Sequence, residues 1–221
     1  MGPVERFASL IQPLSTEPPL DELIALVGAA FDHRADVDVV LGELDHLALQ
    51  CDSSFDGVVG GLFGDGLLRG NRVDYQDPRN SYLHEVVRRR LGLPITLSVV
   101  AVEVGRRLGV TVQPVGLPGH FIVGDGSGRF ADPFNRGAIY DRTELGYVWR
   151  RITGATVAIQ PAMLVPNGPR AVAIRVLNNL RQVFEQRQDD IRLATLAGLR
   201  GAIVELRHES ADHARWVRVW N

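Results

Sequence analysis

The sequence contains no lysine, a single cysteine and no long apolar run. All 24 basic residues are arginine, a bias that we attribute to codon usage rather than to chemistry. The absence of lysine excludes mechanisms in which a lysine amine forms a Schiff base. Because Cys51 is alone, no disulfide can form within the chain, which fits a reducing compartment.

Association with membranes or nucleic acid is not expected from the sequence either. No apolar stretch approaches the roughly 20 residues that a membrane-spanning helix needs. Residues 1–20 lack the basic start and the continuous apolar segment of a secretory signal. The net charge of −2 gives no general attraction to nucleic acid or to anionic membranes. We therefore expect a cytoplasmic protein that contacts neither.

Apolar residues recur every three or four positions over much of the first half of the chain, which is the spacing of helices. Residues 1–20, rich in proline, serine and threonine, are instead expected to form a loosely held arm. Pro94 suits the first position of a helix, and Gly109 suits a helix end. Helices are predicted over 20–30, 37–49, 55–63, 82–91 and 94–108.

After Gly109 the apolar period changes to two, which indicates strands. Three strands are predicted, over 110–117, 120–124 and 129–134. The GDGSG sequence at 124–128 predicts a hairpin turn between the last two. The helical period returns over 170–207 and is broken at 188–190, which predicts a helical hairpin of the length of one tetratricopeptide unit. Helices followed by a short antiparallel sheet indicate an α+β fold.

Two segments together resemble a known family. They are GNRVDYQDPRNSYLHEVVRRRLGLPITLSVVAVEVGRRLGVTVQPVGLPGHFIVG and, shortly after it, ADPFNRG. A GLPITLS helix start followed by PGHF and DPFN resembles the SirB-type branch of the transglutaminase-like superfamily, closely over 67–137. Nearer the C-terminus, VLNNLRQVFEQRQD resembles the tetratricopeptide-like segment of that family.

The resemblance implies three regions within the α+β fold. The first is an N-terminal helical region over 1–66 that packs on the core. The second, over 67–165, is a transglutaminase-like (papain-like) core with a small antiparallel sheet. The third, over 166–221, is a C-terminal helical hairpin resembling one tetratricopeptide unit. A single unit of this kind does not stack on its own, so we expect it to pack on the core.

Transglutaminases and papain-like proteases react through a cysteine, a histidine and an aspartate. The cysteine lies at a helix N-terminus, where the macrodipole favours the thiolate. The histidine moves the proton, and the aspartate orients the imidazole. The resemblance assigns the last two roles to His120 and Asp132, on neighbouring strands. In a catalytic pair the carboxylate would meet Nδ1 of His120, with a cavity in front of Nε2. In the alternative, His120 is a partly buried strand residue and Asp132 begins a turn.

The expected position of the cysteine is occupied by Pro94, which has no nucleophilic group. The nearest hydroxyls belong to Thr96 and Ser98. Thr96 could act as a nucleophile only beside a strong base, and its alternative role is to bond backbone groups in the first helical turn. Cys51 lies outside the matched region, and we expect it to be a structural or incidental thiol.

Further candidates for the site fall in the polar stretch 71–80 and around the predicted pair. The stretch either lines the cleft or forms a loop that caps the next helix and bonds its own backbone. The residues that we expect to line the pocket are Asn71, Asp74, Tyr75, Asn80, Ser98, Phe121 and Asn135.

No cofactor and no metal are expected. His84 and Glu85 begin a zinc-like motif, but no second histidine follows four residues after the first. His33 and His46 have no partners at the spacing of metal ligands. The two GDG sequences read as turns rather than phosphate-binding loops.

The missing cysteine favours a non-catalytic protein that binds a peptide or a protein, or regulates one. The alternative is an enzyme that transfers an acyl group or hydrolyses an amide, using Thr96 or a water with the His120/Asp132 pair. A third interpretation is a structural or assembly module whose arginine-rich helices contact an acidic partner. The oligomeric state stays open.

Overall fold

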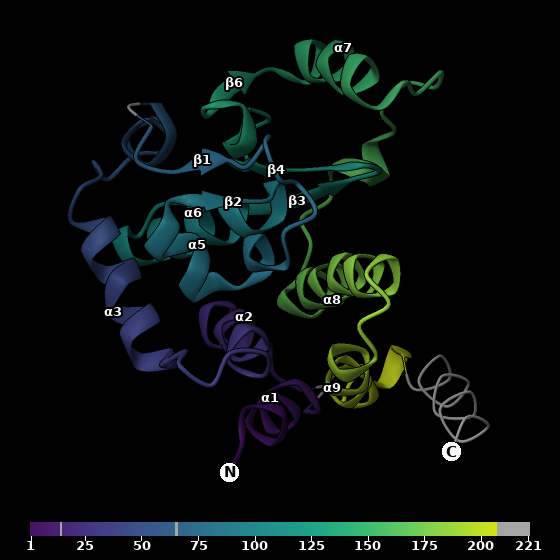
Figure 1. Ribbon diagram of the computed structural model, residues 1–221. Coiled ribbons are helices and arrows are strands. Elements are labelled where there is room, and N and C mark those ends of the chain that lie inside the picture. The colour runs from purple at the N-terminus through teal and green to yellow at the C-terminus, as the bar shows by residue number, and fades with distance from the viewer. Residues whose placement is uncertain (14, 65, 207–221) are drawn as a thin grey trace.

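The computed structural model describes residues 1–13, 15–64 and 66–206 (Figure 1). The helices are α1 (Pro3–Ile11), α2 (Leu20–Ala29), α3 (Val37–Ala48), α4 (Phe55–Val59), α5 (Leu83–Arg89), α6 (Pro94–Leu108), α7 (Arg142–Thr153), α8 (Pro169–Gln186) and α9 (Asp190–Gly201). The strands are β1 (Arg69–Gly70), β2 (Leu91–Gly92), β3 (Gln113–Leu117), β4 (His120–Gly124), β5 (Phe130–Asp132) and β6 (Ala138–Tyr140). A π-helical turn, Gly60–Gly64, extends α4, and one-turn 3₁₀ helices cover Pro78–Ser81, Pro133–Asn135, Pro161–Leu164 and Val204–Leu206.

The sheet is a four-stranded antiparallel meander in the order β3-β4-β5-β6, which confirms the α+β class. Strands β1 and β2 form a separate two-stranded parallel pair. Figure 1 shows α6 against one face of the meander and α7 beyond the other. Every residue of β4 is buried, as expected of a strand covered on both faces.

Alternate side chains of the sheet therefore enter two cores. On the α6 side, Phe121 and Val123 join the main core of the molecule. On the other side, Ile122 of β4 packs with Leu145 and Trp149 of α7 in a smaller core. Trp149 also donates its Nε1–H to the carbonyl of Pro118, 2.9 Å away, which ties α7 to the β3–β4 turn. Strand β6 and helix α7 had no counterpart in the sequence-based prediction.

Helix α6 begins and ends where its sequence predicts. Pro94 occupies the first helical position, and Gly109 ends the helix with a φ of 68°, a left-handed conformation that suits glycine. In the first turn, the Thr96 hydroxyl donates to the carbonyl of Asn80 (2.7 Å) and accepts from the backbone N–H of Leu93 (3.0 Å). Thr96 is fully buried, so this one side chain joins the start of α6 to the preceding loop.

The expectation of a loosely held N-terminal arm is wrong for Pro3–Ile11, which form α1. Phe7 and Ile11, four residues apart, lie on one helical face and are both fully buried. Proline at the first helical position and a bond from the backbone N–H of Gly2 to the Glu5 carboxylate help to start the helix. The apolar spacing therefore outweighed the turn-forming composition of the segment.

A buried ionic network joins α2 to α6. The carboxylates of Asp21 and Glu103 are 5% and 2% exposed, and Arg107 donates to both at 3.0 Å. Burial raises the pKa of the Glu103 carboxyl. Burial also acts to raise the pKa of Asp21, but hydrogen bonds from Arg107 and the Glu22 amide outweigh it, so that pKa is lowered. Each carboxylate thus depends on arginine for its charge to be tolerated.

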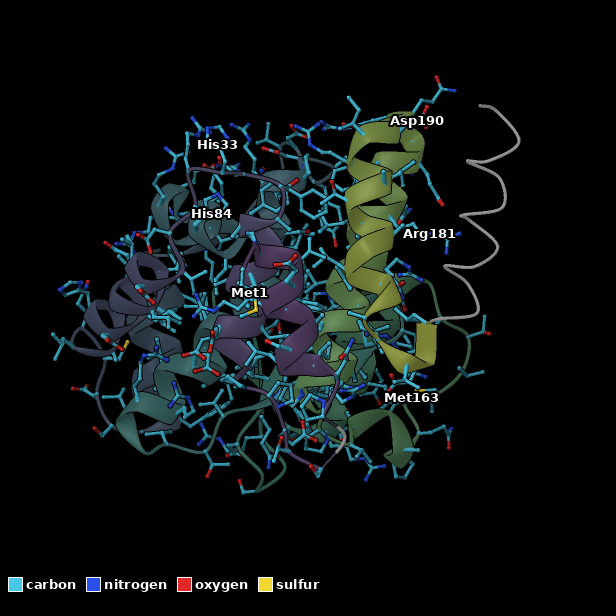
Figure 2. The ribbon with its side chains drawn as sticks, turned by 90° about the horizontal axis from the view of Figure 1, so that it is seen from below. Met1, His33, His84, Met163, Arg181 and Asp190 are labelled. Atoms are coloured by element: carbon cyan, nitrogen blue, oxygen red, sulfur yellow. The ribbon has the colours of Figure 1, made fainter. Side chains whose placement is uncertain are left out.

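Helices α8 and α9 form the predicted hairpin, and residues 207–221 of the predicted C-terminal region lie outside the described residues. Figure 2 shows α9 beside α1, and the two helices are in contact. Leu44, Val100 and Val176, one from each predicted region, belong to the same apolar core. The predicted division at 66/67 and 165/166 stays a prediction. No helix among the described residues is long and apolar enough to cross a membrane.

Replacing Arg107 by methionine should lower the free energy of unfolding by about 3–5 kcal/mol, because two buried carboxylates lose a partner. Arg106 contacts the same two carboxylates, but its side chain is 61% exposed against 13% for Arg107. R106M should therefore cost only about 1 kcal/mol, since water can replace much of its interaction. Denaturant unfolding measures the free energy of unfolding of both variants. Equal losses of stability in R107M and R106M would contradict the proposed network.

Replacing Thr96 by valine should cost about 1–3 kcal/mol of stability, because the Leu93 N–H and the Asn80 carbonyl lose their short bonds to the hydroxyl and keep only a 3.4 Å bond to each other. Ser98 is the matched control, since it lies on the same helix and is equally buried, while its Oγ has no hydrogen-bond partner. S98A should leave stability within about 1 kcal/mol of the wild type. If T96V is as stable as S98A, the assigned role of the Thr96 hydroxyl is wrong.

Candidate functional site

His120 is the first residue of β4, and Asp132 is the last of β5. The register pairs Val123 with Ala131, so Asp132 lies diagonally across from His120 on the neighbouring strand. The two side chains meet at 2.8 Å between His120 Nε2 and Asp132 Oδ2. They are 7% and 2% exposed. The predicted contact is therefore confirmed, whereas a catalytic role for the pair stays a prediction.

The imidazole is oriented opposite to the expectation, which placed the carboxylate at Nδ1. Because Asp132 is reached by Nε2, Nδ1 is the ring nitrogen left for a ligand. In neutral histidine, an Nε2–H donated to a carboxylate leaves Nδ1 as a hydrogen-bond acceptor. The strand positions bring the residues together, but only the packing around the ring decides which nitrogen faces the carboxylate.

Asp132 also begins a turn, as the alternative interpretation held. Its Oδ1 accepts hydrogen bonds from the backbone N–H groups of Phe134 (3.0 Å) and Asn135 (3.2 Å). It thereby caps the 3₁₀ helix that follows β5. The two roles are compatible because each uses a different oxygen. The turn fixes the carboxylate, and the fixed carboxylate orients the imidazole.

A pocket of about 190 Å³ opens beside His120. Four parts of the chain form its walls: the loop before Pro78, the start of α6, the β3–β4 turn and α8. The lining residues are Tyr75, Pro94, Ile95, Gly119, His120, Phe121, Arg175, Asn179 and Gln182. Of the residues predicted to line it, Tyr75 and Phe121 do so, together with His120 and Pro94.

No thiol and no aliphatic hydroxyl is among these lining residues. Pro94 and Ile95 present the start of α6 to the pocket. Thr96 is not in the lining, and its hydroxyl is bonded to the backbone of Leu93 and Asn80. This matches the alternative role proposed for Thr96. Cys51 is not in the lining either; its thiol lies 3.4 Å from the Leu47 carbonyl, and burial raises its pKa.

The polar stretch 71–80 mostly bonds to itself. The Asn71 amide donates to Asn80 Oδ1 at 3.0 Å, and Asn80 in turn donates to the Asp74 carbonyl at 2.7 Å. Asn71 Oδ1 accepts from the Asp74 N–H. Of these residues, none lines the pocket, but their network supports the loop that carries Tyr75. Ser98 and Asn135 are also absent from the lining.

Five pocket residues were not predicted from the sequence: Ile95 and Gly119, and Arg175, Asn179 and Gln182 on α8. The last three are spaced by four and three residues and lie on one face of the helix. Arg175 donates from one terminal nitrogen to the carbonyls of Leu117 (2.6 Å) and His120 (2.7 Å). The available signal was a set of polar residues beside the buried stripe of α8. This signal could not show which part of the molecule these residues would meet.

Asp32, His84 and Glu85 form a group whose possible metal-binding atoms lie within 4.8 Å of one another. His84, which Figure 2 labels, lies on α5 and is not among the residues that line the pocket. Arg34 donates to Asp32 at 3.0 Å, and Arg88 donates to Glu85 at 2.7 Å. Both carboxylates are thus already bonded to guanidinium groups. His84 reaches Asp32 through Nε2 at 3.4 Å, and burial lowers the pKa of its ring.

Known proteins that are similar to this chain match different shares of its length. A UPF0162 protein of Xylella fastidiosa is 43% identical over 121 residues, which are 52% of this chain and 43% of that protein. A UPF0162 protein of Pseudomonas aeruginosa is 29% identical over 167 residues, or 74% of this chain and 55% of that protein. F-box only protein 21 of Mus musculus is 46% identical over 56 residues, 25% of this chain and 9% of that protein.

The chain thus spans about half the length of the bacterial relatives. No solved structure matches it significantly. The family model described as transglutaminase-like superfamily matches residues 20–178. This match includes the His120–Asp132 pair, the start of α6 and part of α8, and covers well over half of the sequence. The chain therefore belongs to the transglutaminase-like superfamily.

Proposed function

We propose that this protein binds a peptide, or a peptide segment of another protein, in the pocket beside His120 and does not catalyse a reaction there. One observation carries the proposal: Pro94 lies at the helix start facing the pocket, and no lining residue supplies a thiol or an aliphatic hydroxyl. The acyl intermediates of cysteine, serine and threonine enzymes form on such a group. The lining around Pro94 nevertheless includes polar side chains that a ligand can contact.

The pocket combines the two kinds of surface that peptide binding uses. Pro94, Ile95 and the Phe121 ring supply apolar contacts. Asn179 and Gln182 can each donate to and accept from a peptide bond. Few polar groups on an apolar wall are typical of a small binding site, where they fix the orientation of the ligand.

We also propose the finer classification that the motifs suggest. The GLPITLS, PGHF and DPFN sequences support membership of the SirB-type branch, and the helical hairpin α8–α9 supports a tetratricopeptide-like unit. The division into three regions is part of the same proposal. A single cysteine supports a reducing compartment such as the cytoplasm.

A second candidate is amide hydrolysis by a water that His120 activates. The observation that favours it is the buried carboxylate that orients the imidazole and leaves Nδ1 to accept a proton. The two candidates differ in turnover. A hydrolase would release amine from amide substrates at a rate that H120A abolishes, whereas a binding protein would show no such rate with either form.

Replacing Pro94 by cysteine tests whether the pocket lacks only its nucleophile. In a C51S background, P94C should react with iodoacetamide at pH 7 at least about tenfold faster than Cys51 does in the wild type. A helix N-terminus and a neighbouring imidazole favour the thiolate, whereas burial raises the pKa of Cys51. Proline at the first helical position can be replaced with little harm to the helix.

The control for this experiment adds H120A to the P94C/C51S variant. The reaction of the new thiol with iodoacetamide should become slower when the imidazole is removed. If the new thiol reacts no faster than Cys51, Pro94 does not mark the position of the nucleophile.

Peptide binding can be measured by fluorescence anisotropy with pools of fluorescein-labelled pentapeptides. Each pool fixes the last residue, and each is prepared both as a free acid and as a C-terminal amide. At least one pool should bind, and the N179A/Q182A variant should weaken that binding about tenfold, as expected for two lost hydrogen bonds.

The matched control is Q186A, because Gln186 is an exposed residue of α8 outside the pocket. It should bind the same pool as tightly as the wild type. Absence of binding to every pool, or equal weakening by Q186A, would refute the proposed site.

A further inference from the structure

We infer that the group recognised in this pocket is a carboxylate of the peptide, and that Arg175 binds it. The inference rests on the proposed peptide-binding function and extends it to the chemistry of the ligand. It is carried by the placement of one arginine, by the charge of the pocket and by the size of the pocket.

Arg175 lies where the β3–β4 turn meets α8. Its two hydrogen bonds to the Leu117 and His120 carbonyls hold one terminal nitrogen at the inner end of the turn. The guanidinium lies over the Phe121 ring, 5.2 Å from its centroid. These contacts restrict the side chain, so little further entropy is lost when it binds a ligand.

The charge of Arg175 has no acidic counterpart. Other shielded arginines are paired with carboxylates, as Arg107 is with Asp21 and Arg89 with Asp77. No Asp or Glu in the described residues lies within 4.0 Å of the Arg175 guanidinium. Burial lowers the pKa of Arg175, and the neighbouring Tyr75 acts in the opposite direction.

The rest of the pocket has the same electrostatic character. Its lining includes Arg175 and His120 but no carboxylate side chain. Asp132, behind His120, is 2% exposed and bonded through both oxygens, so it is not available to a ligand. The net charge of the whole chain is −2, which makes this a local feature rather than a property of the surface. An anion is the complementary ligand.

The dimensions favour a single residue with its carboxylate. A volume of about 190 Å³ lies below the roughly 300–1,000 Å³ of sites for larger ligands. Phe121 and Ile95 can contact an apolar side chain while the guanidinium binds the carboxylate beside it. Tyr75 also lines the site; burial raises the pKa of its hydroxyl, and the charge of Arg175 opposes that rise.

The test compares three ligands: a pentapeptide from the tightest-binding pool as its free acid, the same peptide as its C-terminal amide, and an amidated variant whose last residue is Asp or Glu. The free acid should bind at least about tenfold more tightly than its C-terminal amide, because a hydrogen-bonded ion pair is replaced by a neutral contact. An amidated peptide ending in Asp or Glu distinguishes the source. If it binds as weakly as the neutral amide, the carboxylate is that of the C-terminus; if it regains the affinity of the free acid, a side chain suffices.

Two variants test the assigned residue. R175M should reduce binding of the free acid to the level of the amide while leaving the amide unchanged, whereas R175K should keep part of the difference. R181M is the control on the same helix, because Arg181 donates to Glu185 and does not line the pocket. It should behave as the wild type does.

The comparison between ligand forms does not depend on how well the variants fold. If neutral amides bind the wild type as tightly as free acids, the inference is wrong although peptide binding stands. If no peptide binds in any form, the proposed function itself fails. If R181M abolishes the preference for acids as R175M does, Arg175 is not the residue responsible.

Discussion

The structure depends on the burial of helix α6. Eleven of its 15 residues are buried, including Glu103, which the helix can accommodate only because arginines neutralise it. Helices α2 and α3 cover it on one side and strand β4 on another. A helix enclosed in this way cannot shift along its axis without breaking several contacts at once. Its first residue, Pro94, is therefore held in a fixed position relative to His120 on the adjacent strand.

Much of the fold could be predicted because many helices are specified by the residues within them and at their ends. The spacing of apolar residues predicted α2, α3, α6 and the α8–α9 hairpin, and Gly109 ended α6 where expected. Helix α1 was missed because its two buried residues, Phe7 and Ile11, stand in a segment whose composition suggests turns. Helix α7 packs on the sheet through residues such as Trp149. This is a tertiary contact, and the spacing of apolar residues along the chain does not predict it.

The site was only partly predictable for a related reason. The strand positions brought His120 and Asp132 together, but the orientation of the ring depends on its surroundings. Arg175 contacts the carbonyl of a residue 55 positions earlier in the chain, so its place in the pocket could not be inferred from the sequence of α8. For Thr96, the position was predicted correctly but did not settle the role. Its hydroxyl lies in the first turn of α6, where a nucleophile was expected, but it is bonded to backbone groups of Leu93 and Asn80.

The two oxygens of Asp132 bear on what a histidine–aspartate contact says about function. One oxygen holds the imidazole, and the other caps the turn between β5 and β6. Folding alone thus gives this aspartate a role, whether or not the pair takes part in a reaction. A buried histidine–aspartate contact is therefore weak evidence of catalysis in this fold. The residue at position 94, where the resemblance places the nucleophile, is the more informative one.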